Sequence, residues 1–308
     1  MISIITPVFD ESENLNELFS RIDKVFSNLK EKYEIIFVDN GSNDSSLDVI
    51  KGLAEKNSQI KFVSLTKNFG HQGGIWAGLN HTTNTCIIMD SDLQHPPEVI
   101  PKLIEKWHKG FKVVNTRKNV DRDNRIWKKF FASLFYKIIN SVTNLNLSTG
   151  QSDYCLIDSS VLSVLKQLPE KKIFLRGIVN SLGFETTTVQ YDTEARKSGK
   201  SKFSKVEYID LALNGILSYS SAPVSIFFWV GIIISLFCVG YIIYIGTIYY
   251  FLNNYIDMPP GWATILVSIL FFGSIQLMAL GILGKYLILI LENGKKRPEF
   301  IVKEKKTD

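Results

Sequence analysis

The chain has 308 residues, of which 45% are hydrophobic, and a formal net charge of +5. This length allows a catalytic domain of roughly 200 residues together with a second part. Residues 211–256 and 258–284 contain no charged side chain, and each run exceeds the roughly 20 residues that cross a bilayer. The composition therefore excludes a wholly water-soluble protein, and we predict two transmembrane helices.

Apolar runs and helical patterns alternate through the first 120 residues. Helical patterns cover residues 12–30, and others follow the turn at 40–44 and the glycine-rich stretch at 68–74. We predict strands at residues 2–6, 35–39, 60–66, 86–89 and 112–116, and two more at 152–157 and 184–191. This alternation predicts an α/β fold with a doubly wound, mostly parallel sheet.

Acidic residues follow the predicted strands. Asp10 and Glu11 come after the first strand, Asp39 ends the second, and Asp90 and Asp92 come after the fourth. In an open α/β sheet, ligands bind at the carboxyl ends of the strands. We therefore expect these acids to meet in one site at one edge of the sheet.

Asp90, Asp92 and Gln94 form an oxygen-rich sequence directly after a buried strand. Carboxylate and amide oxygens at this spacing suit Mg²⁺ or Mn²⁺. The alternative is that the two aspartates only cap the helix that starts at Pro96 and Pro97. No glycine follows the first strand, which excludes the usual glycine fingerprint of dinucleotide-binding folds.

Two segments are predicted to lie on a membrane surface. Residues 125–142 form a basic, aromatic amphipathic pattern, which indicates either an interfacial helix or an ordinary helix packed on the sheet. Residues 201–222 are predicted to contain a second interfacial helix. The basic stretch 196–205 lies before that helix, and it would close over phosphates or lie on acidic headgroups.

The predicted two-helix transmembrane hairpin spans residues 223–291. It separates a domain of residues 1–200 from a basic tail at 292–308. Cations flank the hairpin on both sides, whereas the turn at 253–262 carries one negative charge and no cation. The positive-inside rule then places the catalytic domain and both termini in the cytoplasm. With no signal-peptide pattern before the first strand, we expect a multi-pass protein of the inner (cytoplasmic) membrane.

Six short segments carry a resemblance to a known family: residues 6–11 (TPVFDE), 38–44 (VDNGSND), 67–72 (KNFGHQ), 90–98 (DSDLQHPPE), 281–286 (GILGKY) and 296–300 (KRPEF). They are similar to motifs of the family 2 glycosyltransferases. Within that family they resemble the polyprenol-phosphate glycosyltransferases, which include bactoprenol-phosphate glucosyltransferases and dolichyl-phosphate mannose synthases. The resemblance covers nearly the whole chain, and the 90–98 segment matches almost letter for letter.

The resemblance implies a GT-A-like fold and an inverting, metal-dependent transfer of a hexose, with glucose from UDP-glucose favoured, to undecaprenyl (polyprenyl) phosphate. The implied partners are a nucleotide sugar, a polyprenyl phosphate and the membrane, with a possible homotetramer and no nucleic acid. The implied nucleotide-sugar-binding residues are Pro7, Phe9, Glu11, Asp39, Asn68, Gln72, Asp90 and Ser91. Asp90, Asp92 and Gln94 would hold Mg²⁺ or Mn²⁺, and Asp153 and Asp92 would be catalytic. Arg117, Arg176, Arg196, Lys200 and Lys202 would contact phosphate or acceptor.

Several alternatives stay open at this point. Asp153 would act as a base or as an orienting group, or would be a turn acid at a strand end. Arg117 and Arg176 could equally form surface ion pairs. Asn40 stands where the family carries a second acid, and such departures leave the sugar open, including mannose from GDP-mannose to dolichyl phosphate. An alternative hypothesis from a different functional class is that the protein is a non-catalytic membrane scaffold that binds nucleotide sugars, or a flippase subunit.

Overall fold

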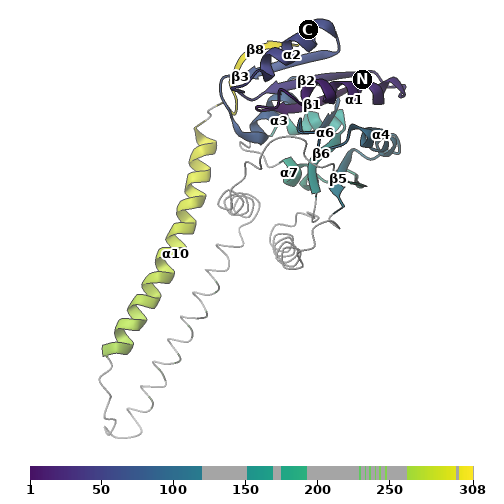
Figure 1. Ribbon diagram of the computed structural model, residues 1–308. Coiled ribbons are helices and arrows are strands. Elements are labelled where there is room, and N and C mark those ends of the chain that lie inside the picture. Colours follow the sequence, from purple (N-terminus) through teal and green to yellow (C-terminus); the bar gives the residue numbers. More distant parts are fainter. Residues whose placement is uncertain are drawn as a thin grey trace. The chain divides into compact units, whose positions relative to one another are not determined.

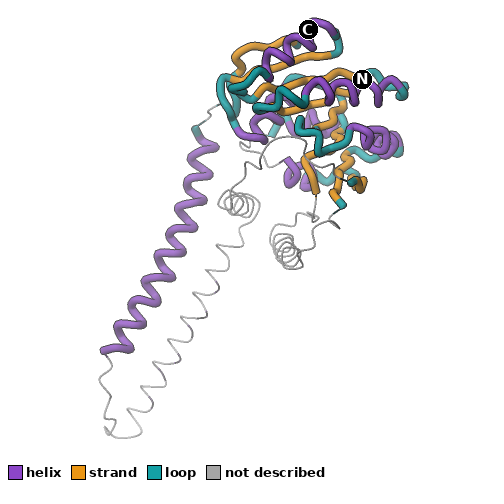
Figure 2. Tube along the Cα trace, in the orientation of Figure 1, coloured by secondary structure: helices purple, strands orange, loops and turns teal. Residues whose placement is uncertain are grey.

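The computed structural model describes residues 1–119, 151–168, 175–192, 262–295 and 298–307, together with isolated positions between 229 and 247. The chain divides into two compact units. Unit 1 comprises residues 1–203 and 297–308, and unit 2 comprises residues 204–296. Figures 1 and 2 show unit 1 as a sheet with helices on both faces, and unit 2 as containing one long described helix.

The core of unit 1 is an eight-stranded sheet in the order β7-β5-β6-β4-β1-β2-β3-β8. The strands are β1 (Ile2–Val8), β2 (Tyr33–Asp39), β3 (Ile60–Leu65), β4 (Thr85–Ile88), β5 (Val113–Lys118), β6 (Gln151–Ile157), β7 (Thr186–Tyr191) and β8 (Val302–Lys306). Of these eight described strands, β6 and β8 run opposite to the other six, which are parallel to one another. The predicted α/β fold with a mostly parallel sheet is confirmed.

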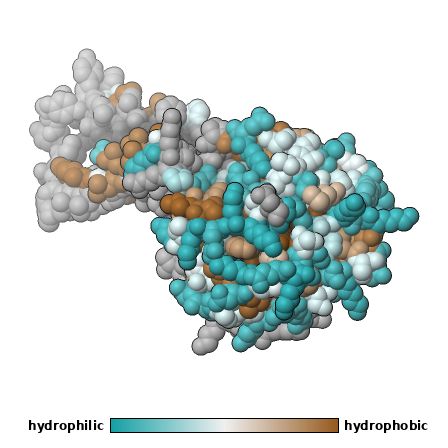
Figure 3. Space-filling model, turned by 90° about the horizontal axis from the view of Figure 1, so that it is seen from above, coloured by the Kyte–Doolittle hydropathy of each residue, from teal (hydrophilic) through white to brown (hydrophobic). Residues whose placement is uncertain are grey.

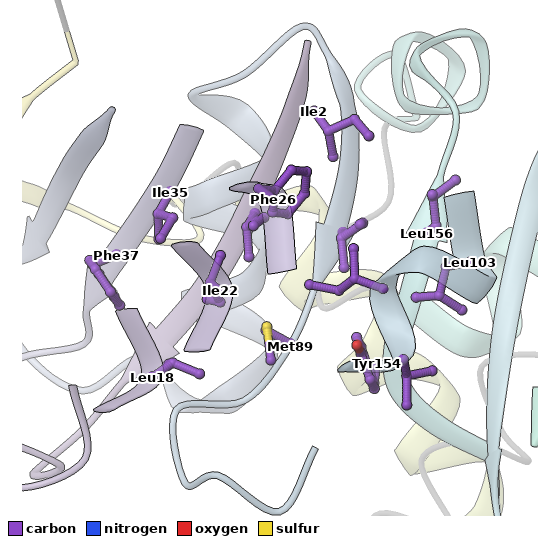
Figure 4. Packing of buried hydrophobic residues seen from close by; sticks show 14 of the residues in the cluster. Ile2, Leu18, Ile22, Phe26, Ile35, Phe37, Met89, Leu103, Tyr154 and Leu156 are labelled. Carbon is purple, nitrogen blue, oxygen red and sulfur yellow. The ribbon is translucent and has the colours of Figure 1, made fainter. Parts of the chain in front are cut away.

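Helices cover both faces of the sheet and bury two apolar clusters. One face carries α1 (Leu15–Ser27), α2 (Ser46–Lys56) and α4 (Ile100–His108), and α4 follows a single 3-10 turn, Pro97–Val99. Figure 4 shows Ile22 and Phe26 of α1 packed close to Ile35 of β2. The other face carries α3 (Gly70–Asn80), α6 (Ser159–Leu165) and α7 (Leu175–Ser181). Hydrophilic residues cover most of the visible described surface (Figure 3).

The structure differs from the predicted elements in several places, and α6 and α7 were not predicted. α1 begins at Leu15 with Asn14 as its N-cap, rather than at residue 12, and the backbone N–H of Ser12 donates to Asp44 Oδ2 at 3.2 Å. Residues 302–306 were predicted only as part of a basic tail, but they form β8, which pairs with β3 at the edge of the sheet. An alternation of Lys and Glu is typical of an exposed edge strand.

Unit 2 contains the helix α10 (Trp262–Gly294), which has 33 residues. At about 1.5 Å per residue it measures roughly 50 Å, longer than the roughly 30 Å of a bilayer's hydrocarbon core. Its window Phe271–Ile288 is long and apolar enough to cross a membrane, and side chains such as Leu277 and Ile290 are exposed. The first predicted span, the turn at 253–261 and the two predicted interfacial helices lie almost entirely outside the described residues, so the second predicted span alone is matched by a helix.

Candidate active site

The polar residues of the predicted site gather at one edge of the sheet, where β1, β2, β3 and β4 end. β6 runs the other way, and its residue Cys155 pairs with Ile88 of β4. If this antiparallel register is continued by two residues, Asp90, just beyond β4, comes opposite Asp153, two residues before Cys155 in β6. An antiparallel strand thus brings an early residue of one strand to the same edge as the late residues of its neighbours.

At the β1–β2–β3 part of this edge, Asp39 uses both of its carboxylate oxygens within the fold. Oδ1 accepts a hydrogen bond from the backbone N–H of Ser42 at 3.0 Å, and Oδ2 accepts one from the Ser64 hydroxyl at 2.8 Å. The side chain is buried. Asp39 therefore holds the turn after β2, and its contact with the nucleotide sugar stays a prediction.

Asn40 connects the turn after β2 to the turn before α3. Its Nδ2 donates to Asn68 Oδ1 at 3.1 Å and to the Gly70 carbonyl at 2.9 Å, and its Oδ1 accepts from the Phe69 N–H at 3.0 Å. A carboxylate could make only the last of these bonds, because it has no donor. The amide at this position therefore has a structural reason, although the resemblance favours an acid there.

The 90–94 loop after β4 is held in a defined shape. The Ser91 hydroxyl donates to the carbonyl of Pro7 at 3.0 Å, and the Gln94 N–H donates to Asp92 Oδ1 at 3.1 Å. Leu93 is buried with a φ of 61°, an uncommon backbone conformation that core packing has to maintain. Neither aspartate is an N-cap residue: the N-cap positions of the 3-10 turn and of α4 are Pro96 and Val99, and neither makes a side-chain cap bond.

Asp153 is the centre of a charged cluster. Its carboxylate accepts from both Nε and Nη2 of Arg176, the latter at 2.8 Å, and from Gln72 Nε2 at 3.3 Å. His71 lies between two acids, since its Nε2 is 3.4 Å from Asp153 Oδ2 and 3.5 Å from Asp90 Oδ1. α3 and α7 thus supply the side chains that surround the acid of β6.

A second histidine, His95, lies on the other side of Asp90. Its Nε2 is 2.9 Å from Asp90 Oδ2, and its Nδ1 is 2.6 Å from the hydroxyl of Tyr191 at the end of β7. The ring is buried and packs edge-on against Tyr154, with 5.3 Å between ring centroids. Asp90 therefore has a histidine near each of its oxygens.

These contacts change the pKa values of the cluster. Burial disfavours the charged forms, but hydrogen bonds and opposite charges outweigh it. His95 and the charge of His71 lower the pKa of Asp90 to about 2, and Arg176 with His71 holds the pKa of Asp153 well below its usual value. The bond to Asp153 and the charges of both acids raise the pKa of His71 to about 9. Both acids are therefore ionised at neutral pH, and His71 carries a positive charge.

The residues of the 90–94 loop fit a divalent cation. Oδ1 of Asp90 is buried and accepts no hydrogen bond from the described residues, which leaves one carboxylate oxygen for a metal. No group of three or more His, Cys, Asp or Glu side chains in the described ranges is arranged to hold an ion by itself. Mg²⁺ is usually held by one or two carboxylates together with substrate phosphates and water. Asp90 and Asp92, with Gln94, suit that pattern.

The remaining predicted residues are placed as follows. Pro7 is at the end of β1, and Phe9 and Glu11 lie just beyond it. The Glu11 carboxylate accepts from the Asn14 side chain at 2.6 Å. Arg117 is near the end of β5. Arg196, Lys200 and Lys202 lie outside the described residues.

Comparison with known proteins decides the family. The model of "Glycosyl transferase family 2" matches residues 3–165. The chain belongs to glycosyl transferase family 2. The chain is 36% identical over 305 residues to an uncharacterized glycosyltransferase of Synechocystis, covering 98% of this chain and 95% of that protein. It is also 36% identical over 311 residues to the bactoprenol glucosyl transferase of Shigella phage SfX, covering 99% of both chains.

Solved structures agree with a glycosyltransferase fold. Glucosyl-3-phosphoglycerate synthase from Mycobacterium tuberculosis, in complex with Mn²⁺, UDP and phosphoglyceric acid, matches with a TM-score of 0.51 at 18% identity, over 70% of this chain and 76% of that one. The mannosyltransferase PcManGT from Pyrobaculum calidifontis, in complex with GDP-Man and Mn²⁺, matches with a TM-score of 0.50 at 15% identity, over 70% and 63%. The predicted GT-A-like fold is supported.

Four residues near the acids of this site were not among the predicted site residues: His71, His95, Tyr191 and Ser152, whose Oγ lies 3.4 Å from His95 Nε2. The two histidines lie inside the 67–72 and 90–98 segments that carry the family resemblance, and their place in these segments could have marked them as site residues. Tyr191 and Ser152 had no such signal, because each reaches the site only through the register of β7 and β6.

Proposed function

We propose that this glycosyltransferase transfers a hexose, most simply glucose from UDP-glucose, to a polyprenyl phosphate at the cytoplasmic face of the membrane, with inversion at the anomeric carbon. The observation that carries the proposal is the position of Asp90, whose Oδ1 accepts no hydrogen bond from the described residues and lies 3.5 Å from His71 Nε2, close to Asp153, which is bound to Arg176. The first acid suits a metal-bound diphosphate. Asp153 is separated from Asp90 by the ring of His71, which is close to both carboxylates. The acceptor phosphate would approach next to Asp153.

The sugar nucleotide would lie along the edge formed by the ends of β1 to β4. Asp39, Asn68 and the residues after β1 would contact its nucleoside, and Ser91 and Gln72 lie near the loop that would face its phosphates. Asp90, Asp92 and Gln94 would hold Mg²⁺ or Mn²⁺. A bound cation stabilises the negative charge that develops on the departing nucleoside diphosphate. Mn²⁺ accompanies a nucleotide in both solved relatives described above, which supports the same expectation.

Asp153 is better suited to orienting groups than to removing a proton. A phosphate oxygen of the lipid is already ionised at neutral pH, so the reaction does not need a strong base. Its two contacts with Arg176 keep the pKa of Asp153 low, which weakens it as a base. Asp153 would then hold Arg176 and His71 as cations where the lipid phosphate approaches. Arg117 and the basic residues Arg196, Lys200 and Lys202 are proposed to assist in binding that phosphate.

The membrane part of the proposal depends on α10 and on the long similarity to bactoprenol glucosyl transferases. We propose a hairpin of two spans with the catalytic domain and both termini in the cytoplasm, and interfacial helices near 125–142 and 201–222. Tetramer formation also stays a proposal. A Cβ added at Gly273, Gly281 or Gly284 of α10 would meet no atom of the described residues within 4 Å, so these positions leave room for close helix contacts.

A donor panel with mass spectrometry of the lipid product tests this function. The full chain, in vesicles that contain undecaprenyl phosphate, is given UDP-glucose, UDP-galactose, UDP-N-acetylglucosamine or GDP-mannose with Mn²⁺. We expect a hexosyl-phosphoryl-undecaprenol from UDP-glucose. A product from GDP-mannose alone would reassign the sugar donor, and tight UDP binding without turnover of any donor would favour a non-catalytic scaffold.

A further inference from the structure

The geometry points to a role for His95 and Tyr191 that the family resemblance does not assign: we infer that they form a hydrogen-bonded relay that fixes which oxygen of Asp90 faces the metal. This inference rests on the proposed metal-binding role of Asp90. The relay runs from the Tyr191 hydroxyl to His95 Nδ1, over 2.6 Å, and from His95 Nε2 to Asp90 Oδ2, over 2.9 Å.

The chemistry of the three groups sets the direction of the relay. An ionised carboxylate can only accept hydrogen bonds, so Nε2 of His95 must carry the proton that points at Asp90. In a neutral imidazole, the other nitrogen is then an acceptor. In that state the Tyr191 hydroxyl donates to Nδ1. Tyr191 thus favours the tautomer of the neutral ring whose Nε2–H binds Oδ2 of Asp90.

The relay leaves the two oxygens of Asp90 in different states. Oδ2 is held by His95, whereas Oδ1 is buried and accepts no hydrogen bond from the described residues, with His71 Nε2 at 3.5 Å. The carboxylate cannot rotate to exchange these oxygens without breaking the bond to His95. A cation approaching this loop therefore meets Oδ1 in a fixed position, and it does not have to order the side chain on binding.

Packing holds the relay in place. The rings of His95, Tyr154 and Tyr191 contact one another, with centroid separations of 5.3 to 5.8 Å, and all three side chains are buried. Tyr154 uses its own hydroxyl elsewhere, donating to the Pro96 carbonyl at 3.2 Å. Two tyrosines therefore share one aromatic cluster, and of the two hydroxyls only that of Tyr191 bonds His95.

This difference provides a matched pair of variants. Tyr191→Phe removes the hydroxyl that sets the tautomer, and Tyr154→Phe makes the same chemical change in the same cluster without touching the relay. His95→Phe removes both nitrogens, whereas His95→Gln keeps an N–H that can reach Asp90. Outer partners of metal ligands typically change metal affinity by about 10- to 100-fold when they are replaced.

The test is titration of the full chain in detergent with Mn²⁺, alone and with UDP, with free Mn²⁺ measured by electron paramagnetic resonance. We expect His95→Phe to weaken Mn²⁺ binding by about 10- to 100-fold and Tyr191→Phe by about 10-fold. His95→Gln should recover part of the loss, and Tyr154→Phe should bind as the unaltered chain does. Thermal unfolding identifies any variant that fails to fold. If His95→Phe does not fold, Tyr191→Phe decides the question.

Asp90→Ala separates the two levels of the proposal. If Asp90→Ala abolishes Mn²⁺ binding while the folded His95 and Tyr191 variants bind Mn²⁺ normally, the relay is overturned and the proposed function is untouched. If Asp90→Ala itself binds Mn²⁺ normally, the metal assignment within the proposed function fails, and the relay fails with it. Equal losses in Tyr191→Phe and Tyr154→Phe would assign the effect to packing and overturn the relay.

Discussion

Acids occur along the whole site edge of the sheet, but its two ends use them differently. At the β1–β2–β3 end, Asp39 has a hydrogen-bond donor on each oxygen and holds a turn. At the β4–β6 end, Asp90 keeps one oxygen without a hydrogen bond from the described residues, and Asp153 is surrounded by cationic side chains. One end maintains the shape of the loops, and the other end presents charge. The position of an acid after a strand does not by itself distinguish these two roles.

Breaking the charged end should have the largest effect on activity. Asp153→Asn removes the charge that holds Arg176 and His71, so we expect transfer to fall by about 100-fold or more, as when a reacting group is misplaced by about 1 Å. Glu98→Gln is the matched control, because Glu98 makes a similar pair with Arg21 on an exposed surface, at 2.6 Å. Glu98→Gln should lower the free energy of unfolding by at most about 1 kcal/mol and should leave the transfer rate unchanged. The initial rates of lipid glycosylation are measured for both variants. Equal rates for Asp153→Asn and Glu98→Gln would show that Asp153 has no role in transfer.

Breaking the shape-holding end should show first in stability. Gly41 has a φ of +72°, and a Cβ there would lie 2.6 Å from the backbone carbon of Lys67. We expect Gly41→Ala to lower the free energy of unfolding by about 1–3 kcal/mol or more. Gly52→Ala is the control, because a Cβ at Gly52 in α2 meets nothing within 4 Å. That variant should gain up to about 1 kcal/mol. If Gly41→Ala unfolds at as high a temperature as Gly52→Ala, the close approach of the turn at Gly41 to the backbone of Lys67 would be contradicted.

Asn40→Asp tests the β1–β2–β3 end of the site further, because it places at residue 40 the acid that the family motif favours. The change removes two hydrogen-bond donors and places a carboxylate beside the Gly70 carbonyl, so we expect a loss of about 1–3 kcal/mol. Asn28→Asp makes the same change at an exposed helix end, where Nδ2 donates to the Lys24 carbonyl, and it should cost less than about 0.5 kcal/mol. Thermal unfolding of both variants measures the difference. Identical shifts would show that the bonds of Asn40 add nothing.

The charged end should also give stability a pH dependence. The pKa of His71 is raised from 6.5 to about 9, so its contribution is complete below pH 6.5 and is lost as the pH rises through 9. The pKa of Asp90 is lowered from 3.8 to about 2, so its contribution is complete above pH 3.8 and is lost as the pH falls through 2. Asp153, Asp90 and Arg176 are the charged groups that face His71.

We expect the melting temperature to be highest between these limits and to decline on the alkaline side. His71→Gln should flatten the alkaline decline. His81→Gln, which replaces a ring that bonds the Ala77 carbonyl at 2.7 Å, should leave the decline in place. Melting temperatures across pH 5 to 10 of both variants measure this smallest of the four effects. An unchanged alkaline decline in His71→Gln would separate His71 from the acids.

The fold was predictable from the sequence because buried parallel strands appear as short apolar runs, as at residues 35–39 and 86–89. β8 was not predictable, because an edge strand that reads Val-Lys-Glu-Lys-Lys has no apolar pattern. Sequence motifs pointed to Asp90 and Asp92, and the family resemblance pointed to Asp153. The structure places Asp90 and Asp153 on either side of His71, and their roles stay predictions. The contacts of Asp90 with His95 and of His95 with Tyr191 depend on strand order, since Tyr191 lies 96 residues from His95 in the chain.

The most direct test of the central claim is metal-dependent transfer of labelled glucose from UDP-glucose to undecaprenyl phosphate by the full chain in vesicles, with and without a chelator. The account predicts that the unaltered chain labels the lipid with Mn²⁺ or Mg²⁺, that chelation abolishes labelling, and that Asp92→Ala reduces it by about 100-fold or more. Full labelling by Asp92→Ala, or labelling that persists when the metal is removed, would contradict it.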